Sequence, residues 1–154
     1  MQYSKIETVE KMEDLMPLIR ESLVRNQSVR FMPHGISMRP MIRQGLDSVV
    51  ITQLPEKLEK YDLLLYQRDD GKYILHRIVG VGKTYTCIGD NQFKEEHGVR
   101  RDQMIALVTG FYRNQKYHSV TEPGYQIYCR FWHCSRPIRH FFRRMIGWLR
   151  RKLR

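Results

Sequence analysis

The sequence predicts a mainly β protein of the α+β class, with a compact antiparallel or mixed β domain between two amphipathic helices. Strand-like segments rich in Val, Ile, Leu and Tyr follow one another closely in the middle of the chain. No helix-length pattern separates them, which disfavours parallel βαβ units. At both ends, apolar residues instead recur every three or four positions. The 154 residues suffice for one hydrophobic core.

The N-terminal helix is predicted over residues 8–25. Its apolar positions are Val9, Met12, Met16, Ile19 and Leu23, which share one helical face. The turn-like residues 26–28 end it, and a short strand over 29–32 leads into the segment that carries the first motif below.

The central strands are predicted over residues 48–52, 63–67, 73–81, 85–88 and 104–112. Asp70-Gly71 lies between two of them and is a strong signal for a hairpin turn. We therefore expect one domain over residues 1–124, with its β core over 29–113, a connector over 114–124 and a separate tail over 125–154.

Positive charge is concentrated in this tail. Residues 125–154 hold nine Arg and Lys and no Asp or Glu, out of a net charge of +11. Over 137–154 the apolar side chains share one side of a predicted helix and the arginines the other, as in helices that lie at a membrane interface. Peripheral contact with a membrane, docking on the chain's own domain, and binding of nucleic acid or a protein partner all remain open. The nearly neutral main domain makes general nucleic-acid binding the less expected of these.

Cellular context is indicated by what the sequence lacks. Three cysteines without paired spacing predict neither a disulfide framework nor a zinc site. We expect no metal or cofactor. The N-terminus has no signal-peptide pattern, and no apolar run reaches the roughly 20 residues of a spanning helix. These features favour a cytoplasmic protein, peripheral at most on a membrane surface.

Three short motifs combine residue types used in nucleophilic catalysis. The first is Gly35-Ile36-Ser37-Met38-Arg39-Pro40, the second is His76-Arg77-Ile78-Val79, and the third is Gly89-Asp90-Asn91. A serine at a tight turn presents its hydroxyl outward, beside backbone N–H groups that can bind an oxyanion. Pro40 suits the first turn of a short helix, which Gly45 is expected to close.

The order and spacing of these motifs resemble the signal-peptidase and LexA-like serine peptidase superfamily. The chain looks most similar to the histidine-type signal peptidases of the endoplasmic reticulum, archaea and sporulating bacteria, and the resemblance covers about residues 29–113. It implies a mostly β fold in which Ser37 is the nucleophile and His76 the general base. An acid should orient His76, and the resemblance leaves Glu96 and Asp90 as equal candidates.

The chain also departs from that family. Many signal peptidases carry a serine two residues before the nucleophile, where this chain has Gly35, so backbone donors alone would bind the oxyanion. The residues before the first motif do not resemble the family's N-terminal membrane anchor, and we expect this protein to lack it. The substrate we expect is a specific peptide or precursor protein.

Less specific interpretations exist for each motif and for the function. Ser37 alone could be a helix N-cap, His76 a structural strand residue, and Gly89-Asp90-Asn91 a simple turn. A LexA-type self-cleaving protein would need an Ala-Gly or Cys-Gly site, and this chain has neither. A non-catalytic binding module on a retired peptidase fold is the second alternative.

Overall fold

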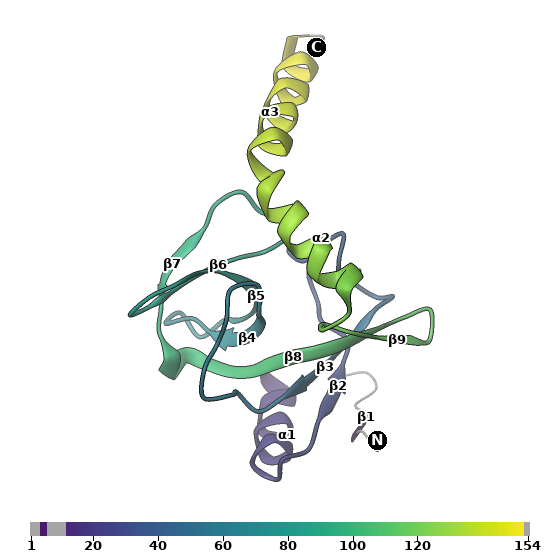
Figure 1. Cartoon of the computed structure of the whole chain (residues 1–154), viewed down its shortest axis with the longest axis vertical. Coiled ribbons are helices and arrows are strands. Elements are labelled where there is room, and N and C mark those ends of the chain that lie inside the picture. Colours follow the sequence, from purple (N-terminus) through teal and green to yellow (C-terminus); the bar gives the residue numbers. More distant parts are fainter. Residues whose placement is uncertain (1–3, 6–11, 153–154) are drawn as a thin grey trace.

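The computed structural model describes residues 4–5 and 12–152, and within them one sheet organises the chain (Figure 1). The sheet has the strand order β1-β2-β3-β8-β4-β5-β6-β7, with β9 paired to β8. Its pairings are antiparallel except for the parallel pair β1–β2. The strands are β1 (Ser4–Lys5), β2 (Val29–Phe31), β3 (Ser48–Thr52), β4 (Leu63–Gln67), β5 (Tyr73–Val81), β6 (Tyr85–Ile88), β7 (Glu96–Val99), β8 (Met104–Arg113) and β9 (Lys116–Ser119).

The predicted central strands are confirmed, four of them with identical bounds. The Asp70-Gly71 turn joins β4 to β5 as predicted, with Gly71 at φ +84°. Strands β1, β7 and β9 were not predicted, and β9 lies within the expected connector.

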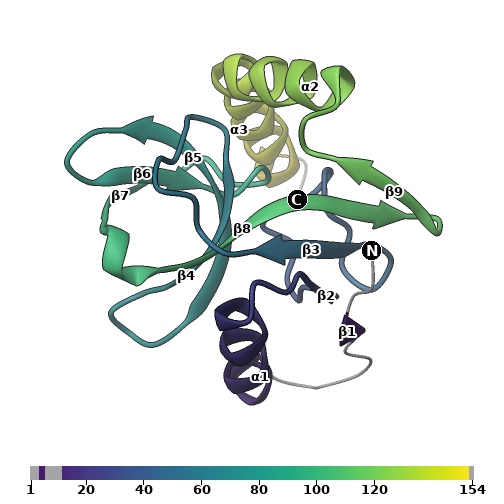
Figure 2. The same cartoon turned by 60° about the horizontal axis from the view of Figure 1, so that its bottom comes forward.

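Two cores form because β4 is buried on both faces. Leu63 and Leu65 pack with helix α1 (Met12–Val24) in the larger cluster, whereas Leu64 and Tyr66 belong to a second cluster enclosed by β5 and β6. This alternation follows from the two-residue period of a strand. Figure 2 shows β4–β7 as a curved unit beside β3 and β8. Of the N-terminal helix predicted over 8–25, residues 8–11 lie outside the described residues.

The prediction of a short helix after Pro40 is wrong. Residues 38–46 form successive turns, because the buried Asp47 carboxylate accepts hydrogen bonds from both the backbone and the guanidinium of Arg43. Such side-chain bonds compete with helical ones.

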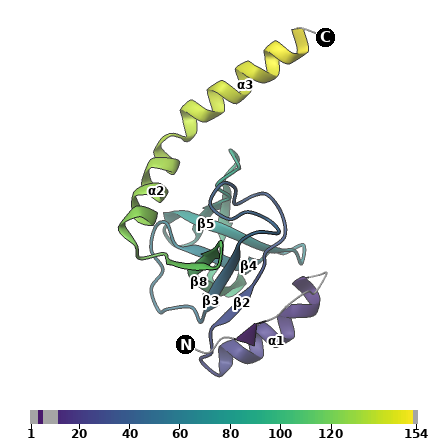
Figure 3. The same ribbon diagram turned by 90° about the vertical axis from the view of Figure 1, so that its right-hand side faces the viewer.

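The C-terminal region consists of two helices, α2 (Pro123–Cys134) and α3 (Arg136–Lys152). Pro137 has no N–H for the His133 carbonyl, so a single continuous helix is disfavoured here. Tyr125 and Cys129 of α2 are buried in the larger core, so the boundary expected after residue 124 separates residues that pack together. Only α3 projects from the domain (Figure 3), and none of its described side chains is buried.

The predicted α+β class with an antiparallel sheet is confirmed, and the unpredicted α2 changes only the proportions of helix and strand. Helices and strands occupy similar shares of the described chain, about a third each, rather than the mainly β balance that was expected. Within the described residues, no helix is both long enough and apolar enough to cross a membrane.

Candidate active site

Ser37 lies in the loop between β2 and β3, and the Gly-Asp-Asn turn holds this loop in place. The backbone N–H of Asn91 donates to the Ser37 carbonyl at 2.7 Å, and the Asn91 side chain donates to the Ile36 carbonyl at 3.2 Å. No described residue accepts a hydrogen bond from the backbone N–H of Ser37 or Met38. Neither N–H group is therefore bonded within the described chain, as an oxyanion-binding pair requires.

His76 approaches Ser37 across Gly89. A methyl group built on Gly89 would lie 3.0 Å from His76 Nε2, 3.0 Å from Ser37 Cβ and 2.6 Å from the Ser37 carbonyl oxygen. Ser37 Cβ and His76 Nε2 are thus at most twice 3.0 Å apart. No Ser37–His76 hydrogen bond forms among the described residues, and such catalytic bonds are often long until substrate binds.

Tyr66 fixes which nitrogen of His76 carries the proton. Its hydroxyl lies 3.3 Å from His76 Nδ1 and donates its one proton to Glu96 Oε2 at 2.7 Å. The Tyr66 oxygen can then only accept from His76, which assigns the imidazole proton to Nδ1 from this network. Nε2 is left with its lone pair on the side of Gly89 and Ser37.

Glu96 begins strand β7 and lies 4.0 Å from His76 Nδ1, with the Tyr66 hydroxyl bonded to both. Arg68 binds both carboxylate oxygens, at 2.8 and 2.6 Å. Burial alone would raise the pKa of Glu96, but the hydrogen bonds from Arg68 and Tyr66 outweigh it and lower that pKa. Glu96 is therefore a fixed negative charge behind His76.

Asp90 has a different set of partners. Its carboxylate accepts two hydrogen bonds from Arg77, at 2.9 and 2.8 Å, and one from Tyr128 at 3.1 Å. Its backbone carbonyl accepts from Trp132 Nε1 at 2.7 Å. Asp90 thus joins the Gly-Asp-Asn turn to α2, and of the two predicted acids only Glu96 reaches His76, through Tyr66.

Burial decides the charge of His76, which is 2% exposed. Burial, and secondly the positive charge of Arg68, lower the pKa of His76 to about 4, against weaker opposing effects of Glu96 and Asp90. The imidazole is consequently neutral at physiological pH, the form that can accept a proton.

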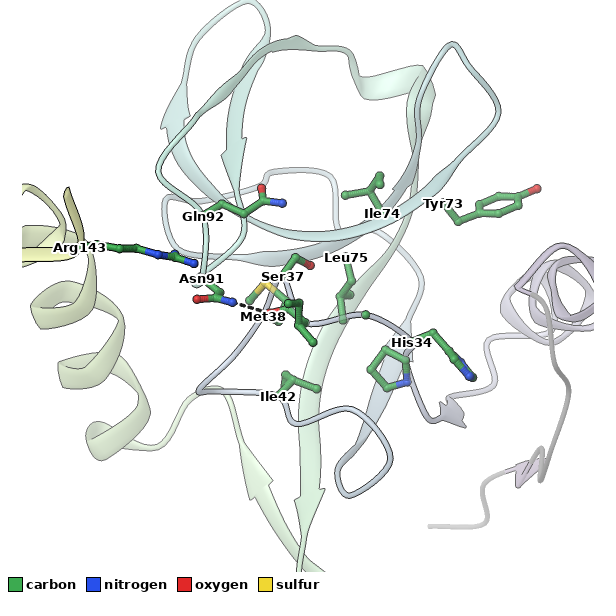
Figure 4. A pocket seen from close by; sticks show the side chains of 13 residues that line it. His34, Ser37, Met38, Ile42, Tyr73, Ile74, Leu75, Asn91, Gln92 and Arg143 are labelled. Carbon is green, nitrogen blue, oxygen red and sulfur yellow. Dashed lines mark hydrogen bonds between the residues drawn. The ribbon is translucent and has the colours of Figure 1, made fainter. Parts of the chain in front are cut away.

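A groove of about 460 Å³ opens in front of Ser37 (Figure 4). One wall is formed by residues 73–75 of β5. On the other side lie Arg143 of α3 and, from the loop after β6, Asn91 and Gln92. These β5 residues pair with β4, whereas pairing with β6 begins only at Arg77. The second edge of β5 therefore faces the groove without a strand partner among the described residues.

Tyr66 and Arg68 were not predicted from the sequence. The hairpin register pairs Leu64 with His76, so Tyr66, two residues further along β4, lies on the same face as His76. Combining the Asp70-Gly71 turn with that period would have identified it.

The sequence matches no protein-family model, and no curated protein matches it significantly. The superfamily resemblance of the three motifs therefore stays a prediction, and the function must be argued from the geometry of the site.

Gly89→Ala should destabilise the protein by about 1–3 kcal/mol, because the added methyl group collides with the Ser37 backbone. Gly124→Ala is the matched control: nothing lies within 4 Å of that methyl position in the first turn of α2, and alanine favours a helix. Urea unfolding of both variants measures the difference. Equal stability of the two would contradict the close approach at Gly89.

The pKa of His76 predicts acid sensitivity of the fold. Between its ordinary value of 6.5 and its folded value of about 4, the unfolded chain binds a proton that the folded chain does not. The free energy of unfolding should therefore decrease as the pH is lowered through this window, by about 2 kcal/mol from pH 7 to pH 5. In His76→Gln the fall should be smaller by this amount, whereas exposed His97→Gln should keep it. An unchanged pH dependence in His76→Gln would refute this assignment.

Proposed function

We propose that this protein is a serine endopeptidase of the signal- or leader-peptidase type, hydrolysing a peptide bond in a specific peptide or precursor protein. One observation carries the proposal. The Tyr66–Glu96 pair holds the proton of His76 on Nδ1, so that the free lone pair of Nε2 faces Ser37 across Gly89.

In the proposed reaction Ser37 Oγ attacks the carbonyl carbon of the scissile bond while His76 Nε2 takes the hydroxyl proton. The new negative oxygen accepts hydrogen bonds from the free N–H groups of Ser37 and Met38. His76 then gives its proton to the leaving amine as the C–N bond breaks. Water, activated by the same imidazole, releases the acyl group from Ser37.

A histidine with a pKa of about 4 is unprotonated at neutral pH. It can therefore accept a proton, but it binds that proton weakly. The imidazolium formed during attack therefore needs a counter-charge, and optimal general bases have pKa values nearer the working pH. Glu96 supplies this charge through the Tyr66 hydroxyl. Closing of the groove by substrate would strengthen the interaction by excluding water.

The substrate fits the groove best as an extended segment. The free edge of residues 73–75 can pair with a peptide backbone, as in other proteins that add a strand to a sheet edge. Such pairing would lay the scissile bond across Ser37. Small side chains next to that bond are expected by analogy with signal peptidases.

Ser37→Ala should abolish cleavage while leaving the fold intact, because only the nucleophilic oxygen is removed. The purified protein and the variant would be incubated with a peptide library and with membranes of the source cell, and new peptide termini read by mass spectrometry. Ser28→Ala serves as control, since Ser28 is also half-buried but does not line the groove. Identical termini from all three folded proteins would exclude catalysis by Ser37 and favour the non-catalytic binding module.

Tyr66→Phe should lower kcat roughly ten- to hundredfold, because it leaves a buried imidazole N–H without an acceptor. KM should stay nearly constant, since Tyr66 does not line the groove. Steady-state kinetics on a cleaved peptide measure both constants, and Tyr85→Phe in the same hydrophobic cluster is the control. A rise in KM at constant kcat would mean that Tyr66 does not position His76.

A further inference from the structure

Helix α3 exposes an apolar face to solvent, interrupted by Lys152 in its last turn, where the ammonium lies 4.9 Å from the centre of the Trp148 ring. Its large side chains are between 39% and 64% exposed; they include Ile138, Phe141, Phe142, Met145, Trp148 and Leu149. We propose that this apolar face binds the surface of an anionic lipid bilayer, with α3 lying in the plane of the interface.

The first two turns of α3 contact the domain through the opposite face, so the apolar face points away from it. Arg136 forms an ion pair with Glu95 at 2.7 Å, and the His140 ring stacks on Phe93 with centroids 4.8 Å apart. The Arg143 guanidinium lies 5.3 Å from the centre of the Phe93 ring. These three residues share one side of the helix by the 100° step per residue. The orientation of α3 (Figure 3) is therefore set by contacts next to the candidate active site.

Helix α2 extends the apolar surface. Ile127 and Phe131 are each 67% exposed, four residues apart and hence on one face of α2. Exposed apolar side chains thus occur on both helices of the C-terminal region, which follow one another in Figure 1.

Basic residues border the apolar face of α3 on both sides. By the same helical step, Arg144 and Arg151 lie along one edge and Arg150 along the other. The helix contains no Asp or Glu. Basic residues near an anionic membrane strengthen binding electrostatically, in addition to the burial of aromatic side chains at the headgroup boundary.

This combination favours lipid over the other occupants of such a surface. In a dimer formed through α3, the arginine-rich edges of two copies would meet without any acidic residue on the helix to neutralise them. A nucleic acid would bind the arginines and leave Phe141, Phe142 and Trp148 in water. An anionic bilayer satisfies both the charged edges and the apolar face.

Membrane binding would place the groove close to the lipid surface, because Arg143 of α3 lines it together with Ser37 (Figure 4). The cleaved bond would then belong to a peptide at the membrane surface. That part rests on the proposed function, whereas lipid binding itself requires neither Ser37 nor His76.

Vesicle flotation tests the inference with the full chain. Vesicles of phosphatidylcholine alone are compared with vesicles that also contain phosphatidylserine. Wild type and Ser37→Ala should both float with the anionic vesicles, and the double variant Phe142→Glu/Leu149→Glu should bind at least about tenfold more weakly. The control Val24→Glu/Leu46→Glu adds the same charge at two other exposed apolar positions and should bind like wild type. Arg144→Gln/Arg151→Gln should reduce the preference for phosphatidylserine.

Several outcomes would overturn the inference. One is no flotation of the wild type with either vesicle; another is equal loss in the α3 variant and the Val24/Leu46 control. Sedimentation as a dimer that Phe142→Glu/Leu149→Glu dissociates, without lipid binding, would assign the surface to a second copy. RNA binding that needs Arg144 and Arg151 but not Phe142 and Leu149, again without lipid binding, would assign it to nucleic acid. Loss of flotation in Ser37→Ala alone would also refute it, whereas failure of peptide cleavage would leave lipid binding intact.

Discussion

Arg77 and Asp90 form a buried ion pair on which the arrangement of the candidate site depends. Both side chains are 3% exposed, and the guanidinium meets both carboxylate oxygens. The remaining guanidinium bonds go to the Tyr125 hydroxyl, Cys129 Sγ and the Tyr61 carbonyl. Removing one partner of such a pair typically costs about 3–5 kcal/mol, because a buried charge is left alone. The pair joins strand β5, the Gly-Asp-Asn turn and helix α2 at one point.

The residues that flank this pair in the chain form the candidate site. His76 precedes Arg77 on β5, and because strand side chains alternate, it faces the opposite side of the sheet. Gly89 precedes Asp90, and Asn91 after it holds the Ser37 loop. Residues of the ion pair and residues of the candidate site thus alternate along β5 and the Gly-Asp-Asn turn. A second ion pair, Arg68–Glu96, serves His76 from the other face, so a strong cation lies near the imidazole without being bonded to it.

Much of this arrangement could be predicted from the sequence, and the exceptions have physical causes. Alternating apolar residues and an Asp-Gly turn were enough for the central strands, and three short motifs identified Ser37 and His76. The identity of the acid behind His76 depends on side-chain geometry. The spacing of the motifs cannot give it, since Asp90 and Glu96 lie only a few residues from each other in the sequence. Tyr66 follows three leucines in β4, and nothing in that run marks it as different from the core residues around it. Helix α2 was missed because only Tyr125 and Cys129 are buried among its side chains, which gives too short an apolar pattern to predict a helix.

The anchoring of the Gly-Asp-Asn turn by α2 has a consequence for how the protein is made. Tyr128 and Cys129 are 38 and 52 positions from the residues they bind, Asp90 and Arg77. A nascent chain whose sheet has already left the ribosome still lacks these side chains, and its Arg77–Asp90 pair remains open to water. The hydrogen bonds that hold the turn beside Ser37 can therefore all form only after residue 132 has emerged, when Trp132 can donate to the Asp90 carbonyl. Completion of the groove in this way depends on helix α2 as well as on the folding of the sheet.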